Sequence, residues 1–221
     1  KNSAQKAEEL LFLMMEESEN EDGTTDDLLS PSSITCDVVL NAWARTRTAE
    51  GAARAEQILE RMEYLRMSGN VKIQPTSYSF ATVISAWAKT RPDRDNKTAN
   101  AERAQSILKR MNDFRRSMSR SNDDRDQEYG NQLYPDAVVY NAVLDAWARS
   151  RDPIAGTRAE ELLLEMEQLQ KQDGKLTPDT ITYNSIINCH ASSRHINAAK
   201  KAETVLKKME TARKNGAKNV S

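Results

Sequence analysis

The sequence repeats one short phrase at long intervals, and this self-similarity is the feature that most constrains how the chain can fold. The phrase is two aliphatic residues, a polar residue, Ala-Trp-Ala and a basic residue. Three copies occupy residues 39–45, 83–89 and 143–149. A fourth, more divergent copy at residues 186–192 has histidine in place of tryptophan. Repetition on this scale is typical of arrays in which each unit packs on its neighbours. We therefore expect an extended surface of equivalent sites rather than one catalytic pocket.

Each repeat contains two segments whose apolar residues recur at i, i+3, i+4 and i+7, which is the spacing of one helical face. The first segments end in the tryptophan or its histidine replacement, and span residues 36–43, 80–87, 140–147 and 183–190. The second segments carry Ala, two aliphatic residues and Met, and span residues 55–62, 104–111, 159–166 and 202–209, with a further match at 7–14. Strand-like alternation is absent. The pattern predicts an all-α fold of about nine helices.

Prolines and glycines mark the helix boundaries. Proline precedes each first helix and disfavours helix in the residue before it, and the Ser, Thr or Asp that follows can cap the new helix; these pairs are residues 31–32, 75–76, 135–136 and 178–179. Gly69, Gly174 and Gly216 follow second helices, where a left-handed residue is favoured. We expect residues 1–221 to form a single array, with a partial repeat at 1–32 that contains only a second helix. Repeats at 33–76, 77–136, 137–179 and 180–221 follow, the last of them truncated, as part of a longer array.

Most of the variation in repeat length lies in one insertion. Equivalent positions are 44 residues apart from Trp43 to Trp87, 60 from Trp87 to Trp147 and 43 from Trp147 to His190. The excess falls in residues 112–134, which are rich in Arg, Asp, Ser and Asn. We expect the first part of this insertion to extend the preceding helix and the rest to form a mobile loop.

Composition excludes several classes of function. The formal net charge is −1, from 32 basic and 33 acidic residues, so no global basic excess points to nucleic acid, although a local basic stripe remains compatible with it. Cys36 and Cys189 are far apart and are expected to be buried and inert, without a disulfide framework. No apolar run reaches the roughly 20 residues of a membrane span. Glycine-rich phosphate loops, nucleophile elbows and metal-ligand clusters are missing from the sequence, so we expect no enzyme, cofactor, metal or small-molecule substrate.

Other polar residues have structural interpretations. His190 and His195 are five residues apart and do not share a helix face, so His190 is expected to replace the tryptophan in packing. The acidic pairs Glu8-Glu9 and Glu160-Glu161 are expected to be solvated. The tryptophans themselves lie on the apolar stripe, which favours packing between helices over base stacking.

Residues 136–146 and 179–188 carry an Asp, short residues, Tyr-Asn and an apolar helix, and in this they resemble the opening of a pentatricopeptide repeat. Residues 159–166 resemble its second helix. The resemblance is looser in the first and second units, which have Cys36-Asp37 and Phe80-Ala81 at the Tyr-Asn position. The tetratricopeptide repeat is the nearest rival, but Leu-Gly is absent after the tryptophans. The resemblance implies a right-handed α-solenoid of helix-turn-helix repeats that are longer than usual for the family.

The resemblance also implies a function and the residues that perform it. Members of the family bind single-stranded RNA with one base per repeat. The fifth residue of the first helix and the last residue of the repeat contact the base edge, and the second residue packs on the base. The implied edge-contacting pairs are Asp37 with Thr76, Ala81 with Asp136, Asn141 with Asp179, and Asn184 alone; Ser32 closes the partial repeat. For Asn141 and Asn184, a hydrogen bond to a neighbouring helix or loop is the alternative interpretation. The implied packing residues are Ile34, Tyr78, Val138 and Ile181. An Asn–Asp pair in this family marks uracil, so the third repeat is expected to bind uracil.

Three cations lie near the ends of first helices, at a position where family members contact phosphate: Arg45, Lys89 and Arg149. A solvated helix end that is favourable to the helix dipole explains them equally well. The resemblance further implies a mitochondrial or chloroplast location, an organellar transcript as partner, and a role in RNA processing, stability or translation. Two other hypotheses remain open: a protein–protein interaction scaffold, and an enzyme whose catalytic domain lies outside this sequence.

Overall fold

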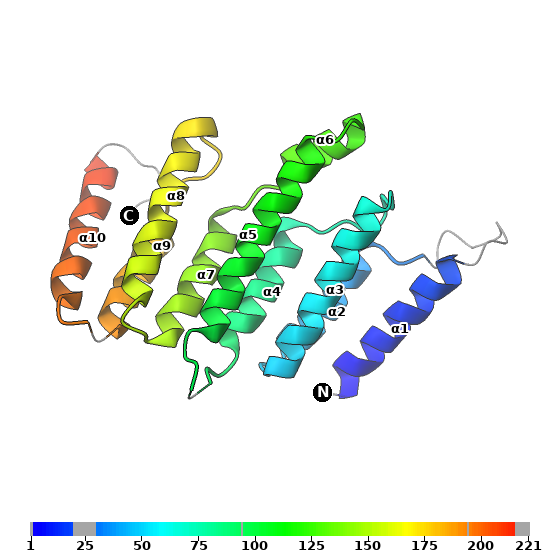
Figure 1. Cartoon of the computed structure of the whole chain (residues 1–221), viewed down its shortest axis with the longest axis horizontal. Coiled ribbons are helices and arrows are strands. Elements are labelled where there is room, and N and C mark those ends of the chain that lie inside the picture. The colour runs from blue at the N-terminus through cyan, green and yellow to red at the C-terminus, as the bar shows by residue number, and fades with distance from the viewer. Residues whose placement is uncertain (1, 20–29, 94, 194, 215–221) are drawn as a thin grey trace. The chain divides into compact units, whose positions relative to one another are not determined.

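The computed structural model describes residues 2–19, 30–93, 95–193 and 195–214, and these ranges contain helices but no strand (Figure 1). The prediction of an all-α fold is confirmed, and the described residues contain ten helices rather than about nine. Their bounds are α1 Asn2–Glu19, α2 Ser33–Ala44, α3 Ala49–Met67, α4 Ser77–Lys89, α5 Ala99–Ser119, α6 Asp124–Gln132, α7 Ala137–Ser150, α8 Ala155–Asp173, α9 Thr180–Ser192 and α10 Ala198–Lys214.

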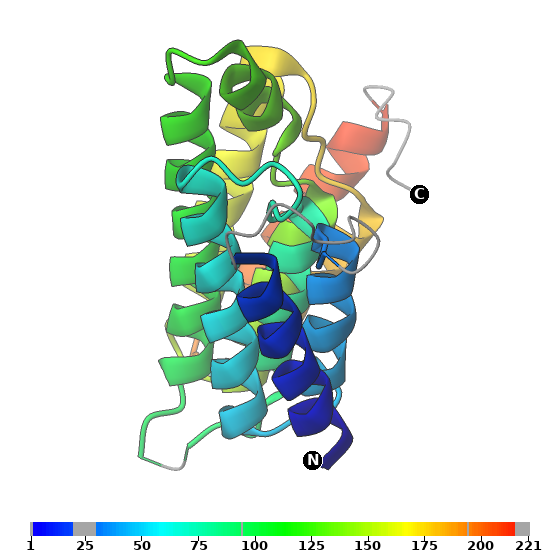
Figure 2. The ribbon, with the colours of Figure 1, turned by 90° about the vertical axis from the view of Figure 1, so that its right-hand side faces the viewer.

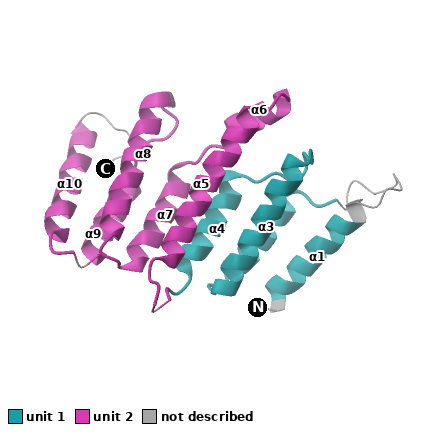
Figure 3. Cartoon of the chain, viewed as in Figure 1, with its two compact units in different colours: residues 1–91 teal, residues 92–221 magenta. Residues whose placement is uncertain are grey.

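The chain divides into two compact units, Lys1–Arg91 and Pro92–Ser221 (Figure 3). In the first unit, α2 packs against α1, α3 and α4. In the second unit, α7 packs against α5, α8 and α9, and α9 packs against α8 and α10. Figure 2 shows α2 and α3 of the first unit side by side in different layers. Within each unit a first helix therefore contacts second helices on both sides, as stacked hairpins require. The repeat boundaries and the single array stay predictions.

The N-terminus of each first helix is fixed by the residue that follows the proline. Ser32, Thr76, Asp136 and Asp179 are the N-caps of α2, α4, α7 and α9, and each side chain accepts a hydrogen bond from the third backbone N–H of its helix. Such a cap stabilises a helix by about 1 kcal/mol. The left-handed terminators are also confirmed at Gly69 and Gly174, which have φ angles of 92° and 67°. Gly216 lies outside the described residues.

The predicted apolar stripes form the core. Cys36, Val39, Leu40 and Trp43 of α2 are at most 3% exposed, and most equivalent residues of α4, α7 and α9 are also buried, although Trp87 and Ile187 are only partly covered. Burial of a Leu or Ile side chain contributes roughly 1.5–3 kcal/mol, so these stripes hold the hairpins together. Cys189 is buried, as predicted. The stripe is less completely covered at the first and last helices, where Leu10 and Leu206 are 61% and 45% exposed.

A ring on each first helix faces a polar side chain on the second helix that precedes it. The indole Nε1 of Trp87 donates to Glu56 at 2.9 Å, and that of Trp147 donates to Gln105 at 2.9 Å. Each acceptor directly follows the alanine that opens the second-helix stripe. Because the same positions recur in each repeat, we call these contacts the ring–acceptor pairs.

On the first and the last of the first helices, α2 and α9, a ring also lies beside an acidic side chain of the preceding second helix. Trp43 lies beside Glu8, whose pKa is raised by burial and lowered in part by Arg54 and by the contact with Trp43. His190 is 1% exposed, which confirms its packing role, and its Nε2 lies 3.0 Å from Oε1 of Glu160. The expectation that the acidic pairs are solvated was therefore wrong for Glu8, which is only 7% exposed, because it fills the space beside an indole ring.

The insertion at residues 112–134 is more ordered than predicted. Its first part does extend the preceding helix, since α5 continues to Ser119. The rest forms the additional helix α6 instead of a loop, because Asp123 caps its N-terminus and Tyr129 packs edge-on against Phe114 with ring centroids 6.3 Å apart. The side chain of Ser121 donates to Asp126 at 2.9 Å and closes the turn between α5 and α6. These contacts hold α6 on the end of α5.

Candidate nucleic-acid interface

Four apolar side chains are exposed at the same position of the four first helices. Each is the second residue of its helix, directly after the capped N-terminus, where no neighbouring helix covers it. The exposed fractions are 75% for Ile34, 56% for Tyr78, 64% for Val138 and 61% for Ile181. Single exposed apolar residues are common on protein surfaces, but here the exposure recurs at one position of the first helices, on α2 and α4 in the first unit and on α7 and α9 in the second.

The third repeat brings its two expected edge-contacting residues together. Nδ2 of Asn141 on α7 donates to Oδ1 of Asp179 at 3.3 Å. The same Oδ1 accepts from the backbone N and the hydroxyl of Thr182 at 2.7 and 2.8 Å, because Asp179 also caps α9. Oδ1 of Asn141 is buried without a hydrogen-bond partner among the described residues. The pair therefore presents an amide N–H from Asn141 and the second carboxylate oxygen of Asp179.

The first repeat connects its pair through a third residue. Asp37 on α2 accepts a hydrogen bond on Oδ1 from the hydroxyl of Ser79 at 2.6 Å, and Ser79 in turn forms the capping box of α4 with Thr76. Burial raises the pKa of the Asp37 carboxyl, and the bond from Ser79 lowers it in part. Asp37 and Thr76 are thus linked by a buried serine, Ser79, which no local sequence pattern singles out.

The other expected residues differ in what they present. Ala81 of α4 is 8% exposed and has no side-chain donor or acceptor. Asp136 is exposed and accepts on Oδ1 from the backbone N of Val139 at 3.0 Å, as the cap of α7. These two residues belong to different units. Asn184 of α9 is exposed, beside the exposed Ile181.

The three candidate cations are not equivalent. Arg45 follows the last residue of α2, Lys89 ends α4, and both are exposed. Arg149 is held instead by Asp145 one turn earlier, with Nε 2.8 Å from Oδ2. Because a surface ion pair of this kind is exposed and screened, it competes only weakly with phosphate, but it does neutralise the charge.

A further contact, which sequence reasoning missed, fixes one of the exposed apolar residues. Nδ2 of Asn41 on α2 donates to the hydroxyl of Tyr78 on α4 at 2.6 Å and to the backbone O of Asp37 at 3.0 Å. The Tyr78 ring is therefore tied to α2 one turn from Asp37. The only available signal was that Asn41 follows Asp37 by four residues and so shares its helix face.

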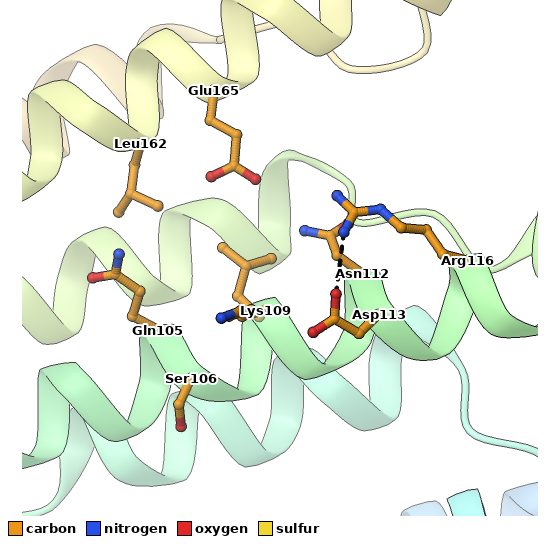
Figure 4. Close-up of a pocket in the computed structure, with 9 residues that line it drawn as sticks. Gln105, Ser106, Lys109, Asn112, Asp113, Arg116, Leu162 and Glu165 are labelled. Carbon is orange, nitrogen blue, oxygen red and sulfur yellow. Dashed lines mark hydrogen bonds and ion pairs between the residues drawn. The ribbon is translucent and has the colours of Figure 1, made fainter.

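An open cavity of about 320 Å³ lies between α5 and α8 in the second unit (Figure 4). Figure 4 shows the ion pair of Arg116 with Asp113 at 3.1 Å beside it. Two polar lining residues already accept internal hydrogen bonds, Gln105 from Trp147 and Glu165 from Tyr140. None of the expected base-contacting residues lines this cavity.

Among the residues that the structure describes, no group of three or more His, Cys, Asp or Glu side chains is placed to hold a metal ion. No helix within the same ranges is both long and apolar enough to cross a bilayer.

The comparisons with known proteins agree with the geometry. Residues 130–193 match the family model of the pentatricopeptide repeat domain, whose members typically bind RNA. The matched segment includes all of α7, α8 and α9, and with them the Asn141–Asp179 pair. No curated protein matches the chain at a significant level. The match therefore identifies a pentatricopeptide repeat domain at residues 130–193, which confirms the expected resemblance for that part of the second unit.

Proposed function

We propose that this chain is a sequence-selective module for single-stranded RNA. In this proposal each base packs beside the exposed apolar residue of a first helix, and its edge meets the fifth residue of that helix and the cap of the next. The four exposed residues support it, because each first helix exposes apolar surface at its second position. Every base has an apolar face, so an exposed apolar side chain can pack against any of the four bases.

The observation that carries the proposal is the hydrogen bond from Asn141 to Asp179. The two helices that carry this pair also carry two exposed apolar residues. Val138 and Ile181 occupy the second positions of α7 and α9, the same two helices that carry the pair. An amide N–H next to a carboxylate oxygen offers one donor and one acceptor, and uracil presents the complementary O4 and N3–H. The third repeat would therefore select uracil.

The charges on this surface would make a moderate electrostatic contribution to the binding of RNA. Arg45 and Lys89 are exposed and could meet phosphate, whereas Arg149 is paired with Asp145. With a net charge of −1, the protein would depend on these local cations rather than on a global field. Binding of an organellar transcript, in a mitochondrion or chloroplast, would then serve RNA processing, stability or translation without catalysis by this chain.

The test is a selection of random single-stranded RNA pools against the purified chain. The proposal expects enrichment of a short motif that contains uracil, and weaker binding of single-stranded DNA or duplex RNA of the same sequence. Failure to retain any RNA, together with specific capture of a polypeptide by the same surface, would establish the protein–protein scaffold instead. Asp37 and the neutralised Arg149 are the features that favour that second function.

A further inference from the structure

The hydrogen bonds around Asp37 have a defined direction. Ser79 has a single hydroxyl proton, and it donates that proton to Oδ1 of Asp37. Thr76 must therefore act as the donor in its 3.0 Å hydroxyl contact with Ser79. The protons of both hydroxyls are used inside the network. Towards a ligand, the first repeat presents acceptors only, chiefly the second oxygen of the Asp37 carboxylate.

This polarity is opposite to that of the third repeat, where Asn141 presents an N–H. A base edge that bears adjacent donors suits the Asp37 site, and a base edge that bears acceptors is repelled by it. Guanine offers N1–H and the N2 amino group side by side. Adenine and cytosine each place a ring-nitrogen acceptor beside their amino group, and uracil offers only one N–H between two carbonyl groups.

An aromatic platform stands next to this carboxylate. The Tyr78 ring is 56% exposed, and Asn41 holds its hydroxyl at 2.6 Å. Ile34 on α2, the helix that also carries Asp37, supplies further exposed apolar surface. Stacking of a base on an aromatic side chain contributes roughly 1–3 kcal/mol, and a purine offers the larger face.

We propose that Asp37 and Tyr78 form a guanine-selective site in the first repeat, with the N1–H and N2 amino donors on the carboxylate and the purine on the tyrosine ring. This inference rests on the proposed RNA binding and adds a base that the resemblance did not assign. Asp37 acts as the selecting residue, Tyr78 as the platform, and Ser79, Thr76 and Asn41 hold the two in place.

The experiment compares random-pool RNA selections against the wild-type chain, Asp37→Asn and Asp124→Asn. The last variant removes one carboxylate from the exposed start of α6 and is the matched control for charge. We expect one motif position to be enriched in guanine by the wild type and the control, and to lose this preference in Asp37→Asn. Binding measured by fluorescence anisotropy should be roughly tenfold weaker when that guanine becomes adenine.

Two further measurements separate the contributions. Inosine, which lacks the N2 amino group, should weaken binding to the wild type but not to Asp37→Asn. Tyr78→Leu should weaken binding of guanine while keeping the preference for it over adenine. If Asp37→Asn selects the same motif as the wild type, the guanine site is refuted while RNA binding stands. If no RNA binds and an arginine-containing peptide binds in its place, the proposed function fails as well, because a guanidinium group offers the same two donors as guanine.

Discussion

Nε2 of His190 lies 3.0 Å from Oε1 of Glu160, at the position where the other first helices place a tryptophan ring beside Glu8, Glu56 or Gln105. An indole N–H does not titrate at ordinary pH, but an imidazole does. Of the four rings in the ring–acceptor pairs, that of His190 is therefore the one that can take up a proton. Gly156 of α8 allows this close packing, because a Cβ at that position would overlap the His190 ring.

The His190 pair predicts a loss of stability in weak acid. Burial lowers the pKa of His190 below its ordinary value of 6.5; Glu160 opposes the shift, while Lys201 and His195 add to it. The folded state thus binds this proton less readily than the unfolded chain, so its contribution to stability is full above pH 6.5 and declines as the pH falls from there through the lowered pKa. Urea unfolding at pH 7.5 and 5.5 should show a larger decrease for the wild type than for His190→Trp. His195→Gln is the control at an exposed histidine, and equal decreases in all three proteins would contradict the prediction.

We expect the protein to become more stable when the buried charge of Asp37 is removed. Its pKa is raised from the ordinary 3.8 by burial, so the folded state favours the protonated carboxyl. The contribution to stability is present below pH 3.8 and is lost as the pH rises through the raised pKa. At pH 7, Asp37→Asn keeps an acceptor for Ser79 without the buried charge, and its Tm should exceed that of the wild type by about 2–4 °C. The difference should shrink towards pH 4, and a Tm below that of the wild type at pH 7 would exclude this account.

Asn141 predicts a local change in RNA preference. Asn141→Ala removes the amide N–H that we propose to contact a base, and leaves Asp179 to cap α9. Binding to the selected RNA should weaken by roughly 1–3 kcal/mol, and the preference for uracil should relax at one nucleotide. Fluorescence anisotropy with the four single-base variants of that RNA measures both effects. Gln132→Ala on α6 serves as the control, and an unchanged preference in Asn141→Ala would remove Asn141 from the site.

We expect Arg45 and Arg149 to contribute differently to the salt dependence of RNA binding. Arg45 is exposed without an ion-pair partner in the described ranges, so Arg45→Ala should lower the slope of log K against log salt by about 1. Arg149 is already neutralised by Asp145, so Arg149→Ala should lower the slope by less. Titrations of RNA at several potassium chloride concentrations compare the two variants. A larger effect at Arg149 than at Arg45 would reverse the assignment.

The fold was predictable where short-range signals decide it. Proline, a capping residue and the i, i+3, i+4, i+7 stripe together fix where a first helix begins and which face it buries. That face in turn fixes which residues are exposed, so Val138 and Asn184 are exposed and Tyr140 is buried, as helix geometry requires.

Contacts between helices were less predictable, because they depend on the offset of one helix against another. The bonds from Ser79 to Asp37 and from Asn41 to Tyr78 join residues 42 and 37 positions apart, and no local pattern encodes them. Glu8 is half of an acidic pair that is typical of a solvated face, and only the neighbouring Trp43 shows why it is buried. For α6, the signal was present in the spacing of Tyr129 and Leu133, but the abundance of Asp and Ser favoured a loop.

The placement of α6 has a consequence for how such chains vary. The extra residues between α5 and α7 fold back on the end of α5 through Phe114 and Tyr129, and so leave the α5–α7 packing in place. Length can therefore change at the turn around Ser121 while the neighbouring hairpin keeps its alignment. A fluorescent reporter or an affinity tag inserted into that turn would leave the side chains of the proposed RNA interface in place.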